Sequence, residues 1–254
     1  MKNPRFDYDY SIHYRTWHSD DPDYVAKMIR SAFSFLKPYL PEMSVEPVLD
    51  IGCGFGFALE ALKQHGFSNI SGVDVDASQV AACQKRGLGV MKINSVVEFL
   101  ENKLEKYAVI IMMDVLEHIP VEDQIQTMTA VHNALKLGGR VILQVPNASS
   151  IVASRRRYGD YTHFCSFTEH SLRYVLKNAG FDAITIPGPK PLKRGSMRLW
   201  HQENRRDLRM WIIRWIWRQV LIAFFSSCDD IETIPTDPDF VAMAMKNRAP
   251  NGKQ

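Results

Sequence analysis

Residues Val48–Phe57 read VLDIGCGFGF, an apolar run that closes on an acid and continues with glycine at every second position. Three of the first four residues, Val48, Leu49 and Ile51, have the β-branched or aliphatic side chains of a buried strand. Residues 57–66 have helical periodicity and end in glycine, as helices commonly do. Because a glycine loop between a strand and a helix lets a ligand approach the backbone, we expect a binding site at this turn.

Strand and helix signals keep alternating along the rest of the chain. Strands are predicted at 69–75, 89–93, 107–113, 140–145, 182–186 and 240–246, and helices at 77–87, 121–139 and 168–181. Such alternation is typical of an α/β fold in which helices cover both faces of a parallel sheet.

The glycine spacing narrows the class of ligand. It is GxGxG, which differs from the GxGxxG of dinucleotide sites, and the GK[ST] of phosphate-binding loops is missing. Asp74 ends the next predicted strand, 20 residues after Gly54, where an acid can accept hydrogen bonds from a ribose diol. The pattern favours an adenosine ligand without phosphates. For the loop by itself, a tight turn that binds nothing is the alternative.

Three motifs together, VLDIGCGFG, GVDVD and IIMMDVLEHI, resemble the class I S-adenosylmethionine-dependent methyltransferases. The resemblance covers about residues 45–187, and FVAMAMK at 240–246 is similar to that family's last strand. It implies a Rossmann-like, seven-stranded, mostly parallel sheet whose last strand is antiparallel. The implied domain spans 45–254 and contains a helical insertion at about 188–236, and residues 1–44 would form an N-terminal cap or lid.

The resemblance also implies S-adenosyl-L-methionine as the cofactor and assigns residues to its parts. Asp74 would bind the ribose, and Asn94 or Ser95 stands where the family has an acid that contacts adenine. The remaining residues assigned to the cofactor pocket are Asp50, Gly52, Cys53, Gly54, Gly56, Val75, Met113 and Asp114, with Asp50 and the glycines at the methionine portion.

Two histidines are candidates for the base that removes a proton from an acceptor hydroxyl. His118 follows the fourth strand, and His163 lies after the fifth strand with Asp160 in a loop that resembles the D-x-T-H loop of glycan methyltransferases. Each histidine could instead only hydrogen-bond the backbone of its loop. Glu117 could equally be an acid that the dipole of the following helix favours. No metal-ligand cluster is visible in the sequence.

The composition and the N-terminal sequence give a weaker indication of where the protein is found in the cell. The four cysteines lack CxxC spacing, and the N-terminus lacks an apolar leader, so we expect a cytoplasmic protein. The N-terminal aromatic and histidine residues would either close over the site or pack a terminal helix; these are His13, Tyr14, Trp17 and His18.

The segment from Lys190 to Arg218 holds nine Lys or Arg against two acids, although the whole chain carries only +3. Residues 211–225 read WIIRWIWRQVLIAFF, which is too short to span a bilayer. If residues 211–225 form a helix, residues 190–225 could together contact an anionic membrane surface. The helix could instead pack against a second subunit or the substrate, or lie in the core. The three arginines at 155–157 could hold a phosphate of a lipid carrier or only be solvated.

We expect a methyltransferase that O-methylates a sugar hydroxyl of a lipid-linked or surface glycan. The alternative acceptor is a lipophilic small molecule of the quinone-precursor type, and the alternative to an enzyme is a scaffold that binds S-adenosylmethionine. Nucleic acid is a poor candidate because the basic residues are interleaved with bulky aliphatic ones. Membrane contact would place the protein peripherally on the inner face of the membrane, and an oligomer is compatible with the sequence.

Overall fold

The computed structural model describes residues 21–41, 45–188, 202–225 and 234–247. The residues predicted to form a lid, from His13 to His18, and the start of the basic insertion lie outside these ranges.

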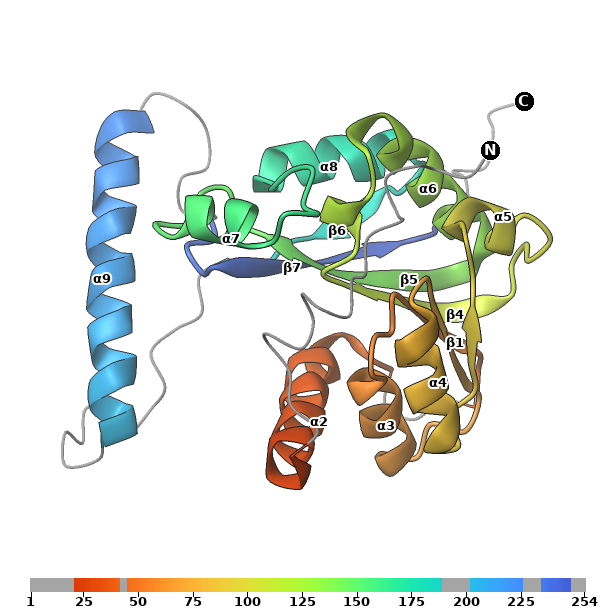
Figure 1. Cartoon of the computed structure of the whole chain (residues 1–254). Coiled ribbons are helices and arrows are strands. Elements are labelled where there is room, and N and C mark those ends of the chain that lie inside the picture. The colour runs from red at the N-terminus through yellow and green to blue at the C-terminus, as the bar shows by residue number, and fades with distance from the viewer. Residues whose placement is uncertain (1–20, 42–44, 189–201, 226–233, 248–254) are drawn as a thin grey trace, which may run out of the picture.

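A seven-stranded mixed sheet forms the centre of the molecule (Figure 1). Its strands are β1 Val48–Ile51, β2 Ile70–Asp74, β3 Val90–Lys92, β4 Tyr107–Met113, β5 Leu135–Pro146, β6 Ala183–Thr185 and β7 Asp239–Met245. They are ordered β3-β2-β1-β4-β5-β7-β6, and β7 runs antiparallel to both of its neighbours. The predicted fold class, including the antiparallel last strand, is confirmed.

Helices lie on both faces of this sheet (Figure 1). They are α2 Pro22–Leu36, α3 Phe57–Gln64, α4 Ala77–Lys85, α5 Val96–Leu100, α6 Val121–Ala134, α7 Ala153–Gly159, α8 Glu169–Asn178 and α9 Gln202–Phe225, with short 3-10 turns η2 Lys37–Tyr39 and η3 Leu116–His118. Helices α2, α3 and α4 lie on one side of the sheet, and α5, α6 and α8 lie on the other (Figure 1).

Alternation along the central strands divides the core between the two faces. On β4, Ile110 and Met112 pack with buried residues of α6 and α8, whereas Val109 and Ile111 pack with Leu36 of α2 and Leu62 of α3. Successive side chains of a strand point to opposite faces, so a strand covered on both sides is apolar throughout. This explains why YAVIIMM gives such a clear strand signal.

The predicted helix at 121–139 is too long by five residues. The observed helix, α6, ends at Ala134, and Leu135 already pairs with Tyr107 in the sheet. Gly138 has a φ of +77°, and its N–H donates to the carbonyl of Lys246, which follows β7. The lysine and glycines of this segment resemble a helix C-terminus in sequence but instead turn the chain into β5. The short helices α5 and α7 were not predicted.

Helix α9 confirms the expected helix and begins at Gln202, well before residue 211. It stands at the side of the molecule beyond β7 (Figure 1). Polar contacts join it to the segment before β7 and to the segment after β5. Arg214 pairs with Asp237 at 2.5 Å, and the indole N–H of Trp217 donates to the Ser149 carbonyl at 2.8 Å.

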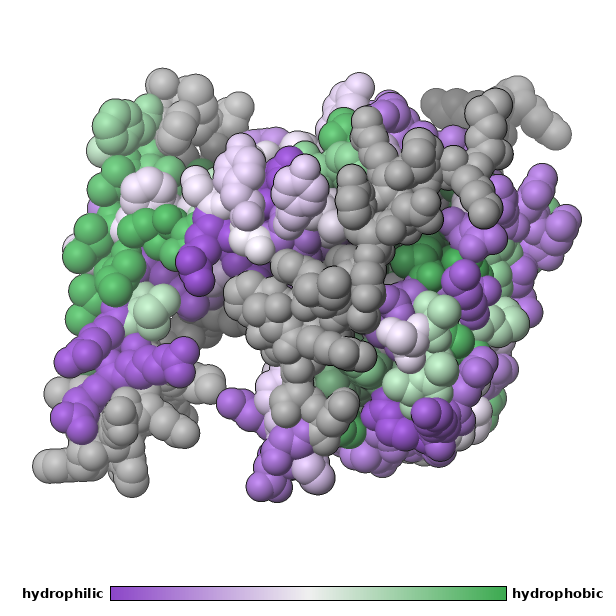
Figure 2. All heavy atoms as spheres, viewed as in Figure 1, coloured by the Kyte–Doolittle hydropathy of each residue, from purple (hydrophilic) through white to green (hydrophobic). Residues whose placement is uncertain are grey.

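The outer face of α9 is apolar and open, which excludes a position in the core. Five of its side chains are between 39% and 52% exposed: Trp211, Ile212, Ile213, Trp215 and Ile216. Figure 2 shows hydrophobic residues gathered along this helix. None of the described helices is long and apolar enough to cross a membrane.

Candidate active site

The glycine loop between β1 and α3 depends on backbone conformations that favour glycine. Gly52, Gly54 and Gly56 have φ angles of +67°, +54° and +71°. A Cβ atom at Gly52 would overlap the side chain of Val115, which follows β4. The N–H of Gly52 donates to the Val73 carbonyl of β2 at 2.8 Å. The loop is therefore held between the carboxyl ends of β2 and β4, where ligands of open α/β sheets bind.

Asp74 lies against this loop, as the sequence predicted. Its side chain is 7% exposed, and its two carboxylate oxygens accept hydrogen bonds from the N–H groups of Gly54 and Asp76, both at 2.8 Å. Burial raises the pKa of Asp74, and the bonds from the backbone N–H groups oppose that rise. A carboxylate offers about four lone-pair positions. The carboxylate can therefore accept further hydrogen bonds from hydroxyl groups of a ligand.

The other predicted cofactor residues lie at the same edge of the sheet. Asp50 is buried in β1, where burial and then the charge of Asp74 hold its pKa well above the usual range. Cys53 is also buried, whereas Val75 is half exposed. Asn94 is exposed after β3, and the hydroxyl of Ser95 caps α5 by accepting from Glu98 N–H at 3.3 Å. The cap gives Ser95 a structural role in addition to the predicted one.

Asp114 directly follows β4 in a left-handed conformation, with a φ of +53° that Asp and Asn adopt more readily than most residues. The side-chain N–H₂ of Gln144 donates to both of its carboxylate oxygens, at 3.0 and 2.9 Å. Burial, and then the charge of Asp239, raises the pKa of Asp114 to about 6. The next residue, Val115, lies against Gly52 of the glycine loop.

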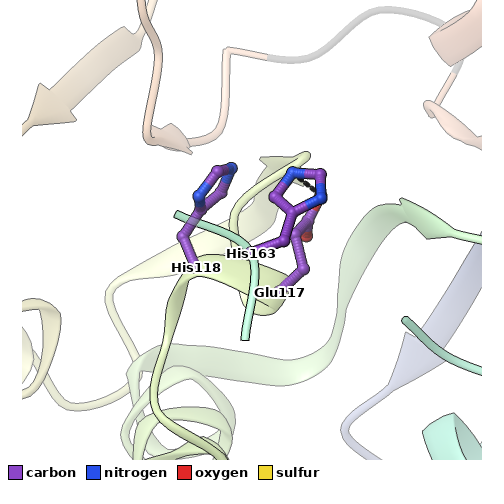
Figure 3. A group of neighbouring side chains, drawn as sticks. All are labelled: Glu117, His118 and His163. Carbon is purple, nitrogen blue, oxygen red and sulfur yellow. Dashed lines mark ion pairs between the residues drawn. The ribbon is translucent and has the colours of Figure 1, made fainter. Parts of the chain in front are cut away.

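The two predicted histidines meet at this edge (Figure 3). His118 lies in η3 after β4, His163 lies in the loop after α7, and their ring centres are 4.6 Å apart. The loops are tied together by the backbone, because Phe164 N–H donates to the Glu117 carbonyl at 2.7 Å. Tyr161 of the same loop, in contrast, is 91% exposed.

Hydrogen bonds fix which nitrogen of each ring carries the proton. His163 Nδ1 lies 2.9 Å from the Arg156 carbonyl, which can only accept, so Nδ1 donates and Nε2 keeps its lone pair. The Thr162 hydroxyl donates to Asp160 at 2.6 Å and therefore accepts from His118 Nδ1, at 2.8 Å. His118 thus also keeps a lone pair on Nε2. Asp160 acts through Thr162 to orient His118, a positioning role.

Burial keeps His163 neutral near pH 7. Loss of water around the ring lowers the pKa of His163, and the charges of Arg156 and Arg157 lower it further, against the opposing effect of Asp160. The alternative that these histidines only bond backbone holds for one nitrogen of His163. It does not account for the Nε2 atom of His163, which faces the Glu117 carboxylate at 4.0 Å.

Glu117 completes this group and is not a solvated acid at a helix start. Its side chain is 0% exposed, and its Oε1 atom lies 4.0 Å from His163 Nε2. Burial, and then the charge of Asp114, raises the pKa of Glu117 well above its usual value. The sequence could not reveal the group, because His163 is 46 residues further along the chain. The apolar run that precedes Glu117 and its position beside a histidine were the available signals.

The amino-acid sequence is similar to those of known proteins. A profile of the methyltransferase domain family matches residues 24–186. The chain is 31% identical over 105 residues to a ubiquinone biosynthesis O-methyltransferase of Pseudomonas aeruginosa, a match that covers 39% of this chain and 44% of that protein. It is 29% identical over 182 residues to the protein of the same name from Cereibacter sphaeroides, covering 65% of this chain and 72% of that one. The chain thus spans less than half of the Pseudomonas relative.

Solved structures agree on the fold. A SAM-dependent methyltransferase from Archaeoglobus fulgidus superposes with a TM-score of 0.65 at 20% identity, covering 94% of this chain and 100% of that one. A phosphoethanolamine N-methyltransferase from Haemonchus contortus, solved with S-adenosyl-L-methionine, gives a TM-score of 0.56 at 16% identity over 86% of this chain and 53% of that one.

Proposed function

Because this chain belongs to the methyltransferase domain family and is an S-adenosylmethionine-dependent methyltransferase, we propose that it methylates the phenolic oxygen of a lipophilic quinone precursor. The relatives named ubiquinone biosynthesis O-methyltransferases support this acceptor over the sugar hydroxyl expected first. When bound, S-adenosylmethionine supplies a methyl group activated by a sulfonium. The glycine loop and Asp74 would hold its adenosine and methionine portions.

One observation carries the proposal of O-methylation: two imidazole Nε2 lone pairs and a buried carboxylate converge in the segments that follow β4 and β5, at the carboxyl edge of the sheet. A hydroxyl must lose its proton as it is methylated, whereas an amine with a lone pair needs less help. A phenol, with a pKa of about 10, is within reach of a neutral imidazole. A sugar hydroxyl is less acidic than a phenol, so the same base would remove its proton less readily.

The acceptor can be identified directly with methyl-labelled S-adenosylmethionine. The purified protein is incubated separately with catechol-type quinone precursors that carry a prenyl tail, with lipid-linked and surface glycans, and with RNA. We expect label on a phenolic oxygen, located by mass spectrometry. Label confined to the glycan fraction would restore the sugar hydroxyl as the acceptor. Tight cofactor binding without transfer in any arm would favour the scaffold.

We further propose that the apolar face of α9 rests on an anionic membrane surface, where such an acceptor would partition. Exposed tryptophans and isoleucines lie on this face, and Arg205, Arg206 and Arg209 are exposed along the same helix. Helices of this composition bind at the interface between lipid and water, and each basic residue near an anionic leaflet contributes about 1 kcal/mol.

The protein should therefore float with vesicles that contain phosphatidylglycerol, and the double variant Trp211→Ser/Trp215→Ser should not. Tyr161→Ser is the matched control, because it removes an exposed aromatic residue that does not belong to α9. Wild-type protein that remains at the bottom of the gradient would remove the membrane proposal. A dimer in lipid-free buffer that only the double variant dissociates would assign the face to self-association.

A further inference from the structure

We propose that Glu117, His118 and His163 bind a divalent cation at the carboxyl edge of the sheet. Each residue offers one ligand atom, and these atoms all lie within 4.8 Å of one another. The three side chains lie beside one another, two of them from η3 and one from the loop after α7 (Figure 3). The inference concerns a site for a resident ion, and its role in catalysis rests on the proposed function.

The carboxylate of Glu117 is the first argument. Both of its oxygens are buried and have no hydrogen-bond partner among the described residues. Buried polar groups are nearly always hydrogen-bonded, because an unpaired one loses its hydration without compensation. A bound cation would satisfy these oxygens.

The second argument is the orientation of the imidazoles. Metal-bound histidines usually donate their other ring N–H to a carbonyl or carboxylate, which fixes the ring and raises its basicity. His163 donates in this way to the Arg156 carbonyl at 2.9 Å. His118 donates to Thr162, which passes the interaction on to Asp160. Both rings are therefore held with Nε2 as the nitrogen that can bind a metal.

The surrounding charge favours a cation. Asp114 and Asp239 both act on Glu117 with negative charge, and Arg156 opposes them. Arg156 itself is engaged with Asp239 at 2.6 Å. The electrostatic potential at the cluster is therefore negative, because the positive charge of Arg156 only partly compensates the negative charges of the two aspartates.

The ligand set indicates the class of ion. Two imidazole nitrogens and one carboxylate suit Zn²⁺, Fe²⁺ and related first-row ions, whereas Mg²⁺ prefers oxygen ligands. A tetrahedral ion about 2.1 Å from each ligand holds the ligands about 3.4 Å apart. Side-chain rotation would bring the present separations to that value. Three protein ligands leave a position open, as in catalytic rather than structural zinc sites.

An open position at the carboxyl edge of the sheet suits the acceptor hydroxyl. A cation there acts as a Lewis acid that lowers the pKa of a bound hydroxyl, whose proton then leaves to water. His118 and His163 would in that case activate the acceptor by holding the ion instead of taking the proton themselves.

Metal binding is measured on the full chain without cofactor or acceptor. Protein stripped with a chelator is dialysed against Zn²⁺, Mn²⁺ or Mg²⁺ and analysed by mass spectrometry of the metal, and Co²⁺ is added to record its visible spectrum. We expect one Zn²⁺ per chain and a Co²⁺ spectrum of nitrogen and oxygen ligands. Glu117→Gln and His163→Asn should each weaken Zn²⁺ binding on the order of 100-fold, since even outer-shell changes cost about 10–100-fold.

His170→Asn is the matched control, because His170 pairs with Glu169 at 3.3 Å on the surface without a third ligand. Circular dichroism confirms that each variant is folded, and Glu117→Gln keeps the shape of the buried side chain. Equal Zn²⁺ binding by wild type and both variants, or none by the wild type, would overturn the site. If the ion binds here and no phenol is methylated, the site stands and the proposed acceptor fails. If phenol methylation proceeds fully in chelator with no ion retained, the proposed acceptor stands and the role of the ion in catalysis fails.

Discussion

Replacing His163 with alanine should lower kcat for a phenolic acceptor by about 10²–10⁴-fold, the usual contribution of a positioned acid or base. The affinity for S-adenosylmethionine should hardly change, because His163 lies in the loop after α7 and not in the glycine loop. The loss follows whether the imidazole takes the proton itself or holds an ion that acidifies the hydroxyl. In both cases the Nε2 lone pair, left available by the bond from Nδ1 to Arg156, is the group that is lost.

Single-turnover rates and calorimetric titration with the cofactor separate these two effects. His170→Ala, whose side chain is 71% exposed, is the control and should retain the wild-type rate. The residual rate of His163→Ala should rise as the pH approaches about 10, because the phenol then ionises in solution without help. An unchanged kcat, or a rate that falls through weaker cofactor binding alone, would show that His163 does not activate the acceptor.

Replacing Asp74 with alanine should weaken binding of S-adenosylmethionine by about 100-fold. Two hydrogen bonds from a ribose diol to a carboxylate are each worth about 1.5–3 kcal/mol, and about 3 kcal/mol corresponds to that factor. The carboxylate also accepts from Gly54 N–H at 2.8 Å, so its loss would loosen the loop that holds the methionine portion. Because kcat depends on the bound complex, it should fall much less than the affinity.

Asp76→Ala is the neighbouring control. Asp76 caps α4 by accepting from Ser78 N–H at 2.7 Å and Gln79 N–H at 3.1 Å, and the change should cost about 1 kcal/mol of folding stability without altering the affinity for the cofactor. Calorimetric titration of both variants measures the difference. An Asp74→Ala variant that binds as tightly as Asp76→Ala would contradict the assignment.

The sheet and the cofactor edge were predictable because their signals are local. Strand β4 is apolar at every position since both of its faces are covered, and glycine recurs in the β1–α3 loop since its backbone needs positive φ angles. Each signal is contained in about ten residues. The end of α6 was predicted wrongly for the same reason: only the pairing of Leu135 with Tyr107, 28 residues away, shows that the helix has stopped.

The acceptor side was only partly predictable, because it is assembled from distant segments. His118 and His163 were expected as separate candidates, but their shared contact with Glu117 depends on how the loops after β4 and β5 fold back. The bond from Phe164 N–H to the Glu117 carbonyl fixes that arrangement. Similarly, the polar contacts of Arg214 and Trp217 determine which face of α9 is open, and no periodicity of the helix reveals them.

The hydrogen bond between Asp74 and the ribose can be measured by deleting one hydroxyl from the ligand. The affinities of S-adenosylhomocysteine and its 2′-deoxy analogue are compared by calorimetry in the wild type and in Asp74→Ala. The missing hydroxyl should cost about tenfold or more in the wild type, as the loss of a hydrogen bond to a charged group does, and almost nothing in the variant. The same ratio of affinities in both proteins would mean that another group binds the ribose.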